Sequence, residues 1–307
     1  MFEKINSKVS RYRKKMSLRM ILALLILVFV VVEILNISVE IDPRYSLSKR
    51  LEARESLQLQ EKVLPKDGVI LPIEWRGFGE KMIKIGVIDS EKFEGLYVSR
   101  GGLGEYEKSL LFDKNTYELI VNEQNSGTIL NLLWAFGLVN ENAILRNGPM
   151  QDEQYGGAEN FASTGGWSLS AGDAMDYYSI VELVSLTAEQ QELVEEVAKN
   201  IYRPCCGNST YFPDCNHGMA MLGFLEIMAS QNVSEQEMYN AALTLNSFWF
   251  PQTYVTIAKY FANRGVDWNE LDAKVILGSS YSSGAGYQDI LQKVEPAVVS
   301  GGGSCGV

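Results

Sequence analysis

Apolar residues recur three and four positions apart along most of the chain, the spacing that gathers them on one face of an α-helix. This spacing predicts helices at residues 79–88, 90–97 and 218–229. Residues 128–138 are apolar on all sides, as expected of a helix buried in the core. The pattern therefore predicts a mostly α fold.

Capping motifs predict the first residues of two helices. Thr187 and Gln190 form a Thr-x-x-Gln capping box, and Ser234 and Glu237 form a Ser-x-x-Glu box, each ahead of apolar residues at helical spacing. Pro251 is expected to end one helix and begin the next, because proline fits the first turn of a helix but not its interior.

The N-terminal pattern is that of a membrane anchor. Residues 1–19 carry seven basic side chains and one acidic one, and residues 20–32 are thirteen consecutive apolar residues. Extension to residues 18–37 gives the length of about 20 residues that spans a bilayer core, with Glu33 and Asn36 included. We expect a single transmembrane helix, an uncleaved signal anchor held in the lipid bilayer. A cleaved signal peptide is the alternative, although no Ala-x-Ala pattern follows the apolar run.

The anchor sets the expected layout of the chain. The positive-inside rule leaves the basic segment 1–19 in the cytoplasm and the rest outside, so the expected location is the cell membrane with one pass. Residues 38–65 are predicted to form a helical stalk or linker, which ends at prolines and glycines. Residues 66–296 are predicted to form a globular, helical, extracytoplasmic domain. Residues 297–307 are predicted to form a flexible glycine-rich tail that carries Cys305.

Composition limits the class of protein. With 46% apolar and 21% charged residues, a chain of 307 residues can bury a sizeable core. The net charge of -11 argues against nucleic acid as a partner, because phosphates would be repelled. No P-loop or Gly-x-Gly-x-x-Gly pattern stands between a strand and a helix, so nucleotide binding has no support.

A long stretch, residues 147–172, is rich in Gly, Ser, Asn and Asp with scattered aromatic residues. Loops longer than about 12–15 residues are more often functional or mobile than filler. A cover over a site and a simple surface excursion both fit this stretch.

The candidate chemistry is concentrated in one short stretch. Cys205, Cys206, Cys215 and His217 lie within thirteen residues, and His217 is the only histidine of the chain. Thiolate and imidazole bind soft or borderline metal ions, so these four residues predict a metal site for copper or zinc. Their spacing is not that of a zinc finger.

Local structure should place these ligands at a helix start. We expect Cys215 and His217 in the first turn of a helix that Asp214 caps, with Asp214 and Asn216 supporting the ligands from outside. Residues two apart on a helix do not share a face, so both ligate one ion only if Cys215 precedes the helix.

Three further sulfur atoms extend the candidate set. The thioethers of Met219 and Met221, added to thiolate and imidazole, make a ligand set that suits Cu(I), although helix methionines are more often core residues. Cys305 is expected either to reach the cluster on its flexible arm or to remain a frayed end.

Two other interpretations use the same cysteines. Outside the cytoplasm a disulfide between Cys206 and Cys215 would close a small loop in a purely structural domain. That pairing leaves Cys205 without a partner or pairs it with Cys305. A thiol-disulfide oxidoreductase is the third interpretation.

The segment also resembles a known family. Residues 204–207 read Pro-Cys-Cys-Gly, Asp214 and Cys215 follow, and a helix and the helix capped at Ser234 come next. Over residues 202–245 this order is similar to that of exported proteins named for a Pro-Cys-Tyr-Cys-Gly-Cys (PCYCGC) motif. This chain lacks the alternating Cys-Tyr-Cys-Gly-Cys. The resemblance implies an exported protein with a metal or thiol role.

Together these observations predict a membrane-anchored extracytoplasmic protein that binds or delivers a soft or borderline metal ion. A protein that donates or accepts the metal is the expected partner.

Overall fold

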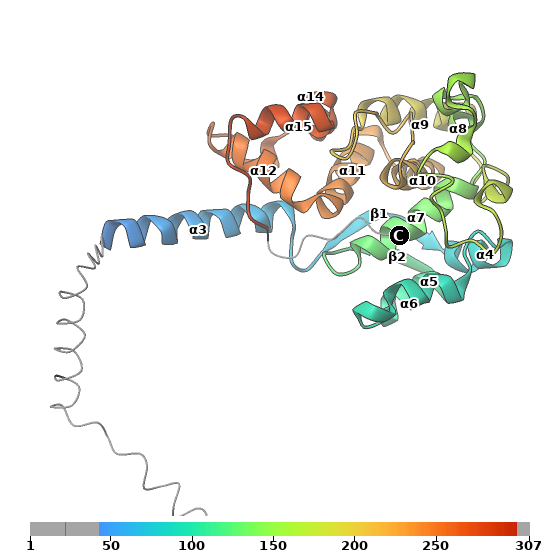
Figure 1. The fold of residues 1–307 in the computed structure, drawn as a ribbon, viewed down its shortest axis with the longest axis horizontal. Coiled ribbons are helices and arrows are strands. Elements are labelled where there is room, and N and C mark those ends of the chain that lie inside the picture. Colours follow the sequence, from blue (N-terminus) through green and yellow to red (C-terminus); the bar gives the residue numbers. More distant parts are fainter. Residues whose placement is uncertain (1–21, 23–42, 300–307) are drawn as a thin grey trace, which may run out of the picture. The chain divides into compact units, whose positions relative to one another are not determined.

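The chain is mostly helical over the residues that the structure describes (Figure 1). The structure is a computed structural model, and it describes residue 22 and residues 43–299. The predicted basic segment 1–19, almost all of the predicted anchor 18–37, and Cys305 lie outside these residues. Within the described part, no helix combines the length and the apolar character that crossing a membrane requires.

Helices follow one another along most of the chain, with longer loops before and after α9. Those of the first half are α3 (Pro43–Val63), α4 (Phe78–Ile85), α5 (Ser90–Tyr97), α6 (Glu105–Phe112), α7 (Ser126–Val139) and α8 (Ala143–Asn147). Those of the second half are α9 (Ala188–Asn200), α10 (Asn216–Ser230), α11 (Glu235–Trp249), α12 (Pro251–Ala262), α13 (Ala273–Leu277), α14 (Ser279–Ser282) and α15 (Gly284–Leu291). Residues from Arg54 onward form one compact unit, so its boundary lies inside α3.

The helices predicted from local signals are present. The capping boxes at Thr187 and Ser234 both form, with side chain and backbone hydrogen bonds in each direction, and they start α9 and α11. Pro251 is the first residue of α12, and only Phe250 separates it from the end of α11. Local signals succeed here because a cap and its partner lie within four residues of each other.

The mostly α fold also contains one small sheet. Strands β1 (Val69–Arg76) and β2 (Thr116–Val121) pair in an antiparallel two-stranded sheet, with α4, α5 and α6 between them in the chain. Leu71, Ile73 and Trp75 are buried and their neighbours in β1 are exposed, the alternation of a strand with one buried face. This alternation runs along β1, and the segments on either side of it in the chain are helical.

The centre of the compact unit is the crossing of α7 and α10, which pack directly against each other (Figure 1). Almost every residue of both helices is buried, as the uniformly apolar sequence of α7 predicted. Gly137 and Gly223 allow the close approach. A Cβ atom on Gly137 would lie 2.2 Å from the carbonyl oxygen of Met219. The first turn of α10 is thereby held firmly against the core.

Candidate metal centre

The cysteine segment is the loop between α9 and α10. Cys215 stands just before α10 in an extended conformation, as its N-cap residue, and Asn216 is the first helical residue. The expectation that Asp214 caps the helix is therefore wrong, because Cys215 occupies the cap position. Since Cys215 precedes the helix, its side chain is not bound to the helical spacing that would keep it from sharing an ion with His217.

Arg203 holds this loop closed from within. Its side chain is only 1% exposed, and its Nη2 donates to the carbonyl oxygen of Phe212 at 3.0 Å and to the carboxylate of Asp214. Its Nε donates to Sγ of Cys215 at 3.1 Å. Asp214 is also held by Asn208, whose Nδ2 donates to Oδ2 at 2.8 Å. A buried charge in this position is tolerated because hydrogen-bonded acceptors surround it.

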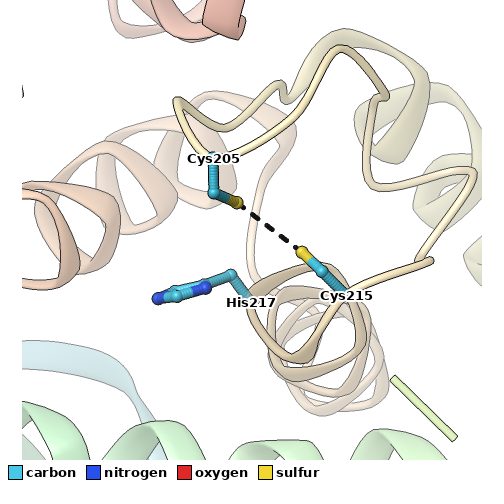
Figure 2. Close-up of side chains that lie close together, drawn as sticks. All are labelled: Cys205, Cys215 and His217. Atoms are coloured by element: carbon cyan, nitrogen blue, oxygen red, sulfur yellow. Dashed lines mark hydrogen bonds between the residues drawn. The ribbon is translucent and has the colours of Figure 1, made fainter. Parts of the chain in front are cut away.

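Three predicted ligands come together at this point. The Sγ atoms of Cys205 and Cys215 lie 3.7 Å apart, and the ligand atoms of Cys205, Cys215 and His217 all lie within 4.8 Å of one another (Figure 2). Cys205 comes from the loop, Cys215 from the helix cap and His217 from the first turn of α10. These three side chains are close enough to hold a metal ion.

The imidazole of His217 is fixed by aromatic neighbours. His217 is 2% exposed, and its ring lies 4.4 Å from that of Phe250 and 5.6 Å from that of Trp249, centroid to centroid. Both rings come from the junction of α11 and α12. A ligand whose ring is held by packing needs little reorganisation when an ion binds.

Cys206 belongs to a second group rather than to the first. Its sulfur lies with the donor atoms of Asp214 and Cys215, again all within 4.8 Å of one another. The four predicted ligands thus do not form one closed set among the described residues. Asp214, which the sequence placed outside the ligand shell, contributes a donor atom instead. Cys205, Cys206 and Cys215 are all free of disulfide bonds in this structure.

The site favours a thiolate on Cys215. Hydrogen bonds from the thiols of Cys205 and Cys206 lower the pKa of Cys215, and His217 and the charge of Arg203 act in the same direction against the effect of burial. The hydrogen bonds of Cys205 with Cys206 and with Cys215, together with burial, raise the pKa of Cys205. A thiolate is the form of cysteine that binds metal and attacks disulfides.

The glycine-rich stretch lies against the site. Its 3₁₀ turns are η3 (Pro149–Gln151), η4 (Glu153–Tyr155) and η5 (Ala158–Asn160). The backbone N–H of Ser163 donates to the carbonyl oxygen of Asp214 at 3.1 Å. The rings of Tyr155, Phe161 and Phe212 pack together, with centroids 5.2 to 5.4 Å apart. This loop therefore supports the cysteine segment from one side.

The remaining candidates have different surroundings. Met219 and Met221 are buried in the hydrophobic core, the common role of helix methionines. Asn216 accepts a hydrogen bond from the backbone N–H of His217 at 2.9 Å, and its role in supporting a ligand stays a prediction.

Sequence reasoning missed Arg203. Its only signal is its position directly before Pro204 and the cysteine pair, and a basic residue there gives no hint of burial. Gly218 is a second missed residue: a Cβ atom on it would lie 2.6 Å from Cζ of Arg203, so glycine leaves the room that the guanidinium fills.

Comparison of the chain with protein-family models, with curated proteins and with solved structures found no match.

Proposed function

We propose that this protein binds copper or zinc through Cys205, Cys215 and His217. The observation that carries the proposal is the convergence of two sulfur atoms and an imidazole nitrogen within 4.8 Å of one another. Two thiolates and one imidazole form a ligand set that both metals accept, and three protein ligands leave a position for exchange.

Exposure of one ligand supports a role in metal delivery. Cys205 is exposed, whereas His217 is buried. A ligand of a partner protein can therefore approach the ion beside Cys205 while Cys215 and His217 still hold it. Delivery outside the cytoplasm further rests on the predicted anchor at residues 18–37.

The test is metal binding by the full-length reduced chain. We expect copper or zinc in protein purified without chelator. Cys215→Ser should weaken binding by more than about 100-fold, because removal of a direct ligand exceeds the 10- to 100-fold cost of removing an outer partner. Elemental analysis measures the metal content, and competition with a chromophoric chelator measures the affinity. Ser209→Ala, in the same loop, is the matched control and should bind as the wild type does.

Two results would contradict the proposal: a wild-type chain that binds neither metal, or a Cys215→Ser variant that binds with unchanged affinity.

A thiol-disulfide couple is the second candidate function, favoured by the 3.7 Å separation of the Cys205 and Cys215 sulfur atoms. In this reaction the two cysteines form a disulfide and a substrate disulfide accepts the two electrons, becoming two thiols. Redox titration of the metal-free chain distinguishes the two functions. A reversible loss of two thiols at a potential in the range of about -120 to -270 mV, without metal binding, favours the oxidoreductase.

A further inference from the structure

Cys215 takes part in two donor groups. The first contains Cys205, Cys215 and His217, and the second contains Cys206, Asp214 and Cys215. In each group all donor atoms lie within 4.8 Å of one another, and the sulfur of Cys215 is the only atom common to both.

The two groups have different surroundings. In the first group, the imidazole of His217 packs against the rings of Phe250 and Trp249. In the second group, the carboxylate of Asp214 accepts hydrogen bonds from Arg203 and Asn208. Apart from the shared Cys215, the contacts that hold the two groups therefore differ: aromatic rings on one side, and a guanidinium and an amide on the other.

Thiolate chemistry allows the shared atom to serve both groups. A thiolate sulfur has several lone pairs and bridges metal ions in sulfur-rich clusters, and Cu(I) is the soft ion that thiolates select. In the second group, Cys206 and Cys215 supply two sulfur donors, with the Asp214 carboxylate as a weaker third.

Charge also favours two monovalent ions over two divalent ones. With three thiolates and the Asp214 carboxylate ionised, the donors of the two groups carry four negative charges, and Arg203 beside them carries one positive charge. Two Cu(I) ions leave one negative charge in total. Two divalent ions would cancel the four negative charges and leave the buried guanidinium without a compensating charge, which is costly.

We propose that the site holds two Cu(I) ions bridged by Cys215, one bound by Cys205 and His217 and the other by Cys206 with Asp214. This inference rests on the proposed metal-binding function and goes beyond it in the number of ions and in the role of Cys206.

The experiment is an anaerobic Cu(I) titration of the full-length chain, with a chromophoric Cu(I) chelator as competitor. Every variant, and the reference chain, carries Cys305→Ser, so that the thiol of the tail does not contribute. We expect two Cu(I) ions per reference chain, one in Cys206→Ser, one in Cys205→Ser, and none that survives competition in Cys215→Ser. X-ray absorption of the reference chain loaded with two ions should show copper-copper scattering.

The outcomes separate this inference from the proposed function. If the reference chain binds one ion and Cys206→Ser also binds one with the same affinity, the two-ion site is overturned and the metal-binding function still stands. Two ions without copper-copper scattering overturns the bridge. No bound copper or zinc at all overturns both. Urea unfolding of each metal-free variant checks that the fold persists, and Ser209→Ala is the matched loop control.

Discussion

At the scale of single residues, a buried arginine holds the loop that carries the candidate ligands. Arg203 joins the loop backbone, the carboxylate of Asp214 and the sulfur of Cys215, and Gly218 leaves room for its guanidinium. Removing one member of such a buried, hydrogen-bonded set leaves the others with unsatisfied charge.

We predict that Gly218→Ala destabilises the chain by about 1–3 kcal/mol, because the added Cβ would collide with the guanidinium of Arg203. Alanine is otherwise the better helix residue by about 0.5–1 kcal/mol. Urea unfolding measures the difference. Gly95→Ala in α5 is the matched control, since a Cβ atom there meets nothing within 4 Å, and it should be neutral or stabilising. Equal behaviour of the two variants would show that Arg203 yields without cost.

At the scale of elements, the crossing of α7 and α10 positions the site. The cap and first turn of α10 carry Cys215 and His217, and the rest of that helix is locked against α7 through a close backbone contact at Gly137 and Gly223. Backbone atoms at such a crossing cannot rotate away from an added atom as a side chain can.

We predict that Gly223→Ala costs at least about 1–3 kcal/mol of unfolding free energy. Its Cβ would lie 2.7 Å from both the backbone nitrogen of Gly137 and the carbonyl oxygen of Leu133. Gly127→Ala, in the first turn of α7 and with open space around its Cβ, should not destabilise the chain. Chemical unfolding of both variants is the measurement, and a Gly223→Ala variant as stable as Gly127→Ala would refute the packing argument.

At the scale of the whole molecule, a buried carboxyl group links distant parts of the core. Glu226 on α10 is fully buried, and Asn140 at the end of α7 donates to it at 3.0 Å. Asn140 in turn accepts hydrogen bonds from the backbone of Leu183 and Val184 before α9. Burial raises the pKa of Glu226 well above 4.5, against the opposing effect of the Asn140 and Asn142 amides.

This shift makes stability depend on pH with a definite sign. Above pH 4.5 an unfolded chain loses the proton of Glu226, whereas the folded chain retains it until its own, higher pKa is reached. The contribution of Glu226 to stability is therefore full below pH 4.5. It is lost as pH rises from 4.5 to the higher pKa of the folded chain, by up to about 1.4 kcal/mol per pH unit.

We predict that Glu226→Gln, which cannot ionise, becomes more stable relative to the wild type as pH increases above 4.5. Urea unfolding of both chains at a series of pH values gives the difference directly. Glu237→Gln, at an exposed capping position, is the control for loss of a charge elsewhere and should follow no such rising trend. A Glu226→Gln difference that is constant with pH would mean that the carboxyl group is ionised at no cost.

Local features of this fold follow from the sequence alone. Caps, prolines and helical spacing act between residues within about four positions, so α9, α11 and α12 start where Thr187, Ser234 and Pro251 indicated. The gathering of soft donors in one stretch is also a property of the sequence, and three of the four predicted ligands do meet.

Tertiary structure decided how the donors divide and what holds them. Cys206 joins Asp214 rather than His217, because Arg203 and Asn208 close the loop on that side. The pairing of β1 with β2 and the packing of the glycine-rich stretch on the site join residues tens of positions apart. Such contacts depend on which surfaces the core brings together, and no spacing rule within a single segment contains that information.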